Sequence, residues 1–241
     1  MILRRVIEHV KAQNWTAVAL DFVIVVLGVF IGLQVQDWNT ARNARAAAHE
    51  YRERLVTDME LSVSRNQKQI DYGRFQISQL DFVLAALTSC HLDAGEAGAF
   101  GAGLYNMGRF DLPTMIMGTI DELNATGDFK LIGDPALRRS ISDTVRIYRT
   151  EFAVEPQLTG RIVPHVNYVR SHVRFMLDEN VDYAPSVNSD KVFYDFDALC
   201  ADEQFINAVA AVREMTQAAV SLNEEVRDRQ SELLTALGAA T

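Results

Sequence analysis

An almost uninterrupted apolar run near the N-terminus constrains this chain more than any other feature. Residues 18–35 include only one charged side chain, that of Asp21. As a helix rising about 1.5 Å per residue, the run spans about 27 Å, close to the roughly 30 Å of a bilayer's hydrocarbon core. The chain's two tryptophans, Trp15 and Trp38, flank it, where indole rings favour the headgroup layers. The sequence predicts a transmembrane helix over residues 17–38, with these tryptophans as interface anchors.

A cleaved signal peptide is the alternative interpretation of the run. A basic leader followed by an apolar stretch fits both kinds of segment. The nearest Ala-x-Ala cleavage pattern, at residues 44–46, lies well beyond the end of the run, so we favour an uncleaved anchor.

Basic residues on both sides of the run leave its orientation open by count alone. Three precede it and four follow it: Arg4, Arg5 and Lys11, then Arg42, Arg45, Arg52 and Arg54. A short basic leader usually stays in the cytoplasm, and long domains cross largely regardless of flanking charge. We therefore expect a cytoplasmic amphipathic leader over residues 1–16 and a periplasmic helical domain over residues 39–241. The protein would be a single-pass protein of a bacterial inner membrane.

The charge of the domain narrows its partners. The chain has 23 basic and 32 acidic residues, of which residues 1–36 hold three and two, so the remainder has a net charge of −10. Such a surface repels nucleic-acid phosphates and anionic lipid surfaces. We expect no nucleic-acid partner, although the same charge also serves simply to keep a domain soluble.

A long helix is predicted after the membrane run. Residues 39–87 contain no proline and one glycine. Apolar or small residues recur there with a period near 3.5, which Asn66 interrupts. They form a packed seam, within a bundle or between subunits: Met59, Val63, Ile70, Gly73, Ile77, Leu80, Leu84 and Leu87.

Turn and cap residues divide the next part of the domain. The small-residue segment 93–108 predicts a turn and a tightly packed short helix. It lacks the glycine spacing of a phosphate-binding loop, which argues against phosphate binding there. Pro113 suits the first turn of a helix that Gly127 closes, and Asp134-Pro135 starts another helix.

The remaining sequence completes an all-α prediction. The helix from Asp134 is expected to run to about Glu179, with breaks at Pro156 and Pro164. The main loop follows, and Asp202 caps a last helix of near-heptad spacing. No segment alternates as a strand does. The predicted fold is an N-terminal transmembrane helix that continues into a long helix, with an extracytoplasmic helical bundle.

Catalytic and metal-binding patterns are missing from the sequence. No two of the five histidines are three or four residues apart, and His165 and His172 are two helical turns apart, too far for one zinc ion unaided. Neighbouring carboxylates have the pattern of solvated helix faces. We therefore expect no enzyme, no metal and no cofactor.

Two cysteines, Cys90 and Cys200, are far apart in the sequence. In the cytoplasm they would be inert thiols, whereas in an oxidising periplasm they could pair as a disulfide. Spacing alone does not supply the geometry that pairing requires, so both readings stay open.

One face of the membrane run gathers its small and acidic residues. At 100° per residue, with Asp21 at zero, Val25 lies at about 40°, Gly28 at −20°, Gly32 at 20° and Val35 at −40°. Glycines four apart let a second helix approach closely in lipid. We favour a helix-packing face that includes Asp21. The alternative is an interfacial carboxylate that merely extends to water, with incidental glycines.

Two segments resemble a known family. These are "LDFVIVVLGVFIGLQVQDWN", residues 20–39, and "TIDELNATGDFKLIGDPALR", residues 119–138. Both are similar to the uncharacterised bacterial single-pass membrane family known as domain of unknown function six-zero-nine-zero. That family has glutamate at the position of Asp21, and residues 156–201 resemble nothing in it. The resemblance implies a single-pass protein with a helical extracytoplasmic domain and no established activity.

These features favour a membrane-anchored helical scaffold or accessory subunit. It would act through helix–helix association, as a homo-oligomer or with another membrane protein in the lipid bilayer. The alternative is a periplasmic sensor or ion-coupled single-span unit that uses Asp21, because an acid in a lone span resembles that of stator proteins. An enzyme ranks third.

Overall fold

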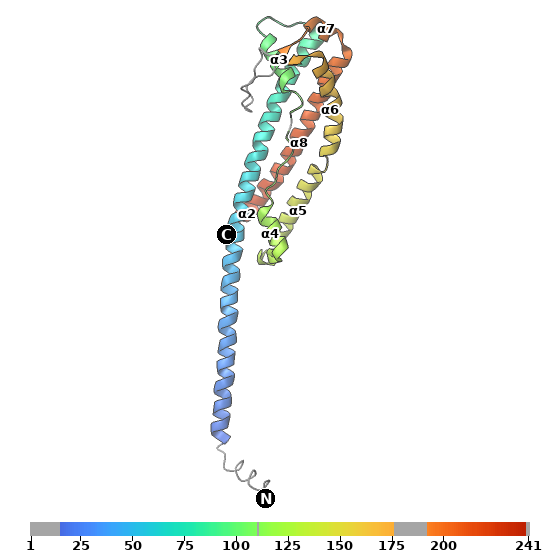
Figure 1. The fold of residues 1–241 in the computed structure, drawn as a ribbon. Helices are drawn as coiled ribbons and strands as arrows, with labels where there is room; N and C mark the ends of the chain where they lie inside the picture. Colours follow the sequence, from blue (N-terminus) through green and yellow to red (C-terminus); the bar gives the residue numbers. More distant parts are fainter. Residues whose placement is uncertain (1–14, 110, 176–191, 240–241) are drawn as a thin grey trace. The chain divides into compact units, whose positions relative to one another are not determined.

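The computed structural model describes residues 15–109, 111–175 and 192–239. The chain divides into two compact units, Met1–Tyr51 and Arg52–Thr241. Helices make up nearly all regular structure of the described residues, which confirms the mainly α class (Figure 1). The expected leader over residues 1–16 and the side chain of Trp15 lie outside what is described.

Helix α2 (Trp15–Ser89) runs without interruption for 75 residues, as predicted from residue 39 onward. Among the described helices, it is the one long and apolar enough to cross a membrane. None of its apolar window is buried among the described residues, so this part of α2 does not belong to the core of the described chain.

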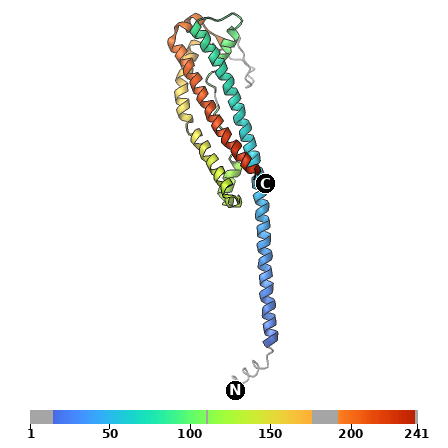
Figure 2. The ribbon, with the colours of Figure 1, turned by 180° about the vertical axis from the view of Figure 1, so that it is seen from behind.

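In the second unit, the predicted seam of α2 is covered by α8 (Glu203–Ala239), which lies between α2 and the remaining long helices (Figures 1 and 2). A Cβ placed on Gly73 would collide with the side chain of Val220, and Ile70 and Ile77 cluster with the same valine. The within-bundle alternative for this seam therefore holds, and its residues are used inside one chain.

Short elements follow α2. Helix α3 (Ala97–Asn106) is packed as expected, with six buried residues. The prediction for Pro113 is wrong: helix α4 (Gly118–Thr126) begins later, and Pro113 is buried in a segment without regular secondary structure. We call this segment, residues 111–117, the strap. A proline suits a buried irregular segment because it has no N–H that would need a partner.

The predicted caps are confirmed. Gly127 closes α4 with a φ of 74°, ahead of the short helix η1 (Asp128–Leu131). Asp134 accepts a hydrogen bond from the Ala136 N–H at the start of α5 (Pro135–Phe152). Asp202 accepts from the N–H groups of Gln204 and Phe205 at the start of α8.

The predicted break at Pro164 is wrong, whereas the one near Pro156 is confirmed. A new helix, α6 (Glu155–His172), begins with Pro156 in its first turn and continues through Pro164. Pro164 removes one bond to the carbonyl of Gly160. Both residues are exposed, so that carbonyl remains open to water.

Two short strands contradict the expectation that no strand is present. Strands β1 (Arg174–Phe175) and β2 (Val192–Phe193) pair antiparallel, and helix α7 (Phe196–Ala201) occupies part of the expected main loop. Two residues are too few to show alternation in a sequence. Residues 176–191 of the expected loop lie outside the described part.

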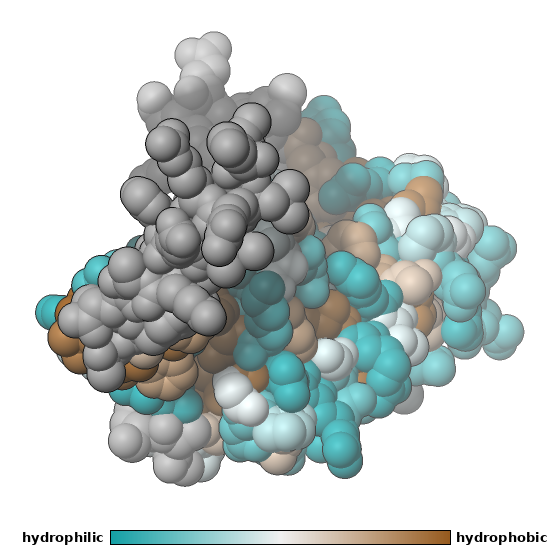
Figure 3. Space-filling view, turned by 90° about the horizontal axis from the view of Figure 1, so that it is seen from below, coloured by the Kyte–Doolittle hydropathy of each residue, from teal (hydrophilic) through white to brown (hydrophobic). Residues whose placement is uncertain are grey.

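The core of the second unit lies where α2, α3, α6, α7 and α8 meet. All seven apolar residues that give α8 its near-heptad spacing are buried, in this core or farther along α8: Phe205, Val209, Val212, Ala219, Val226, Leu233 and Leu237. Among the coloured residues in Figure 3, hydrophilic ones predominate on the surface and hydrophobic ones form smaller patches.

Candidate functional site

The main candidate surface is the apolar part of α2, residues 20–38. Its large apolar side chains are 47–69% exposed. A helix this apolar on all sides is stable only in lipid or under another protein surface. This surface therefore requires an environment that the described chain does not supply.

All five residues of the predicted packing face are exposed on α2: Asp21, Val25, Gly28, Gly32 and Val35. A Cβ added at either glycine would meet nothing within 4 Å. No described residue pairs with the Asp21 carboxylate. The face is therefore open, and its two glycines leave a shallow strip along the helix.

Glycines elsewhere in the chain show what close packing does with such positions. A Cβ on Gly103 would lie 2.6 Å from Val83 Cγ2, and one on Gly108 would lie 2.5 Å from Val166 Cγ2. These glycines permit an approach that any side chain would block. Gly28 and Gly32 offer the same freedom with no neighbour among the described residues.

Trp38, the predicted anchor at the domain end of the apolar run, is exposed. The Arg42 guanidinium carbon lies 5.8 Å from its ring centroid. A cation over an indole face is a favourable pair, and both groups suit the polar headgroup layer.

A buried cluster of polar side chains in the second unit, the polar cluster, holds the strap, and the sequence analysis did not predict it. The fully buried Asn66 side chain accepts from the Thr114 N–H at 2.8 Å and donates to the Thr114 carbonyl at 2.9 Å. It also donates to Gln230 Oε1 at 2.8 Å, and Gln230 donates to the same carbonyl at 2.9 Å. One amide from α2 and one from α8 thus take the place of a neighbouring strand. The signal was Asn66, which interrupts the seam of α2.

Further side chains extend this arrangement along the strap. Ser62 accepts from the Ile116 N–H at 3.0 Å, and Asn223 donates to the Asp111 carbonyl at 2.8 Å. Gln76 donates to the Asn106 carbonyl at the end of α3, at 2.8 Å. The buried backbone between α3 and α4 is therefore bound mainly by side chains, which fixes its path across the bundle.

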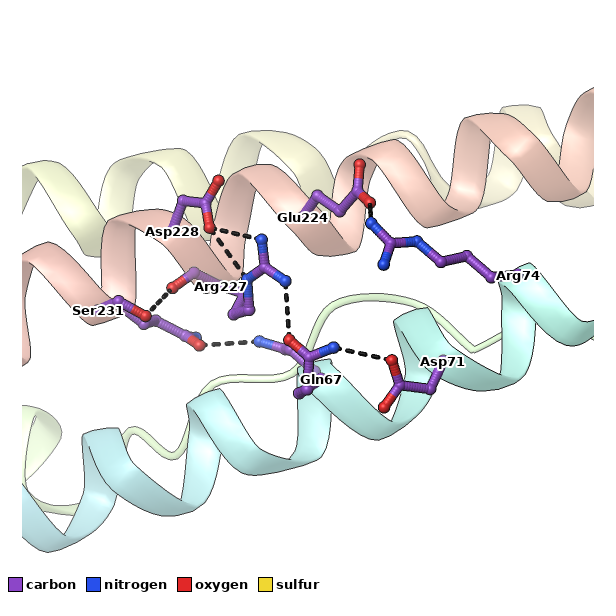
Figure 4. Close-up of polar contacts among 9 residues, drawn as sticks. Gln67, Asp71, Arg74, Glu224, Arg227, Asp228 and Ser231 are labelled. Atoms are coloured by element: carbon purple, nitrogen blue, oxygen red, sulfur yellow. Dashed lines mark hydrogen bonds and ion pairs between the residues drawn. The ribbon is translucent and has the colours of Figure 1, made fainter.

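Ion pairs between α2 and α8 lie on the exposed side of the polar cluster (Figure 4). Arg74 of α2 pairs with Glu224 of α8 at 2.5 Å, and Arg227 of α8 donates to Gln67 of α2 at 2.7 Å and to its neighbour Asp228. Exposed pairs contribute about 0–1 kcal/mol each. They align the two helices and do not form a site.

A groove of about 660 Å³ lies between α4, η1 and α5. Its apolar floor includes Ile120, Phe129 and Ile141, and Arg146 and Arg149 stand at its side. None of its lining residues is a carboxylate, a histidine or a cysteine. The groove therefore offers no acid–base pair, and the Ser142 and Thr150 hydroxyls that line it donate to backbone carbonyls of their own helix.

The histidines and cysteines of the described residues do not gather into one site. His165 and His172 both lie on α6, and the described residues contain no cluster that could hold a metal ion. Cys90 follows α2 and Cys200 lies in α7, both as free thiols. Burial, and after it the nearby Cys90 thiol, raise the pKa of the Cys200 thiol to about 12.

Comparisons with protein families, with curated proteins and with solved structures give no match. The resemblance of residues 20–39 and 119–138 to a single-pass membrane family remains a prediction. Function therefore has to be inferred from the residues themselves.

Proposed function

We propose that this protein is a single-span membrane anchor that acts as a scaffold or accessory subunit through helix–helix association. Residues 17–38 of α2 cross the membrane, and the face with Asp21, Gly28 and Gly32 packs on the same face of a second copy or on another membrane protein. The helical domain then lies on the periplasmic side, as the basic leader favours.

One observation carries this proposal: the apolar part of α2 is exposed on every side, and its small-residue face is open. Lipid by itself is a suitable environment for the apolar side chains, but lipid chains do not pack closely against a strip of glycines. A partner helix gains dispersion contacts there that two larger side chains would prevent.

The seam of α2 from Met59 to Leu87 gives no support to association, because α8 of the same chain covers it. The proposal rests on the membrane segment. This placement sets the experiment, since variants in residues 20–38 leave the fold of the second unit untouched.

An ion-coupled single-span unit is the second candidate, and the unpaired carboxylate of Asp21 favours it. In hydrocarbon a carboxylate costs about 2.5–3.5 kcal/mol at the membrane centre and less near the interface. Such a group needs a proton, a cation or a donor from another helix.

The test compares the full-length protein in detergent with Gly28→Leu/Gly32→Leu. We expect the variant to lose oligomeric mass by light scattering, or to lose its co-purified membrane partner. The matched control is Val23→Leu/Val26→Leu, which adds bulk on the opposite face at about −160° and 140° and should change neither. Equal mass and equal partner recovery in both variants would contradict the proposal.

A further inference from the structure

The two cysteines of this chain meet at one end of the helical domain. Cys90 directly follows α2, and Cys200 lies in the last turn of α7. Their side chains are neighbours, close enough for a side-chain hydrogen bond between the two thiols. Leu87 and Leu199, close to each cysteine in sequence, belong to one core cluster. Residues 110 positions apart are thus held together by packing that does not depend on sulfur.

The backbone at Cys90 is unusual. Its φ is 46°, the one positive value at a non-glycine position among the described residues. The His91 N–H donates to the Ala86 carbonyl at 3.2 Å and the Cys90 N–H to the Leu87 carbonyl at 3.3 Å, which together form the terminal turn that glycine usually closes. A side chain there is strained. Stability alone would favour glycine, so the cysteine points to a use for its sulfur.

The two thiols differ in access. Cys90 is exposed, whereas Cys200 is partly covered. A reagent from solution therefore reaches Cys90 first, and Cys200 is placed to react with whatever Cys90 has become.

We propose that Cys90 and Cys200 form a disulfide in the mature protein, made by exchange with the disulfide of an oxidising protein and joining the end of α2 to α7. The inference rests on the proposed topology, because a cytoplasmic domain would keep both thiols reduced.

The exchange balances in two steps. The Cys90 thiolate attacks one sulfur of the oxidising protein's disulfide, forms a mixed disulfide and releases the first thiolate of that protein. The Cys200 sulfur, giving up its proton, then attacks Cys90 Sγ and releases the second thiolate. The domain loses two electrons and two protons, and the oxidising protein becomes a dithiol.

A disulfide here would close a loop of 111 residues, counted from Cys90 to Cys200. Such a loop ranks among those for which the chain-entropy account expects large stabilisation. For a domain of this size we expect reduction to lower the Tm by roughly 10 °C.

The first measurement uses full-length protein from bacteria whose thiols are blocked with a maleimide before lysis. We expect no label without prior reduction and two labels after it, by intact mass. Cys90→Ser and Cys200→Ser should each show one label in the unreduced sample. Two labels on the unreduced wild type would overturn the disulfide.

A second measurement separates that failure from a failure of topology. Purified, reduced full-length protein is mixed with oxidised glutathione, and an intramolecular disulfide is expected without dimer. If it forms there while the protein in cells keeps two thiols, the disulfide proposal and the periplasmic placement are both overturned. If it fails to form, only the disulfide is overturned, and protease accessibility in spheroplasts then reports the topology by itself.

The Tm difference supplies the last readout. Reductant should lower the Tm of the wild type and leave that of Cys90→Ser/Cys200→Ser unchanged. An equal effect of reductant on both proteins would contradict the proposal.

Discussion

Helix α2 meets two different environments along its length. Over residues 52–89 one face of the helix is buried in the domain, and its buried Ser62, Asn66 and Gln76 each bond within the chain. Over residues 20–38 its apolar side chains are exposed, and no described residue pairs with Asp21. Polar residues and the glycine in residues 52–89 therefore make contacts inside the folded domain. Those in the apolar part are available for association.

The largest expected effect lies in the domain part. Asn66→Leu removes the two bonds from Asn66 to the Thr114 backbone and leaves the partly buried Thr114 N–H without this acceptor. We expect a loss of about 3 kcal/mol in the free energy of unfolding, measured by urea titration followed by circular dichroism. Ser64→Leu, at an exposed position of the same helix, is the control and should change little. Equal effects of the two variants would show that the hydrogen bonds from Asn66 to the strap add no stability of their own.

A smaller effect sharpens the comparison between glycines. Gly73→Ala places a methyl group against Val220, which has a branched side chain with little room to move. We expect a loss of about 1–2 kcal/mol in the free energy of unfolding, after the intrinsic helix preference for alanine is included.

The same change at Gly160, where a Cβ meets open space, should give the opposite sign, a gain of up to about 1 kcal/mol. Gly28→Ala should leave domain unfolding unchanged. If Gly73→Ala is as stable as Gly160→Ala, close packing at Gly73 contributes nothing.

The Asp21 variants test the apolar part. Asp21→Asn keeps the shape and a side chain that can hydrogen-bond but removes the charge, so we expect it to retain oligomeric mass and partners. Asp21→Leu removes both, and we expect a loss of about 1 kcal/mol, roughly five-fold in association. An ion-coupled role predicts failure of both variants. Equal recovery for Asp, Asn and Leu would exclude packing and coupling alike.

The smallest expected effect concerns pH in the domain. The Tyr168 hydroxyl, which donates to Asp202 at 2.9 Å, lowers the pKa of that carboxyl, helped by the Phe205 and Gln204 N–H groups. A lowered folded-state pKa means stability that is present above the ordinary pKa of 3.8 and lost as the pH falls through the folded-state value.

The difference in Tm between wild type and Asp202→Asn should therefore shrink between pH 5 and pH 3, the range in which this carboxyl itself takes up its proton. Asparagine keeps the cap, so only the charge is tested. A difference that grows on acidification would contradict this assignment.

The sequence predicts best what it encodes locally. Asp134, Gly127 and Asp202 act on backbone groups within three residues, and all three were placed correctly. The length of α2 followed from the absence of breakers. The buried face of α8 followed from its repeat, because one helix face meeting one core leaves a periodic trace.

The strap could not be predicted, since its partners are far away in sequence. Thr114 is bound by residues 48 and 116 positions away, so the local pattern around Pro113 suggested a helix start instead. Asn66 was visible only as a gap in the repeat. The nearness of Cys90 and Cys200 has the same origin, because it depends on how α2 and α7 pack and not on spacing.

The way in which the strap is held also affects which residues should be conserved in evolution. The described bonds that hold it end mostly on its backbone: the Thr114 N–H and carbonyl, the Ile116 N–H and the Asp111 carbonyl. Every residue except proline carries those same groups. Mutations at the strap positions that are not buried can therefore accumulate while its path is kept, and Ser62, Asn66, Asn223 and Gln230 in the helices are constrained together with the buried Pro113 and Met115. Across distant descendants, the recognisable signature of this segment would be four polar residues that lie outside it.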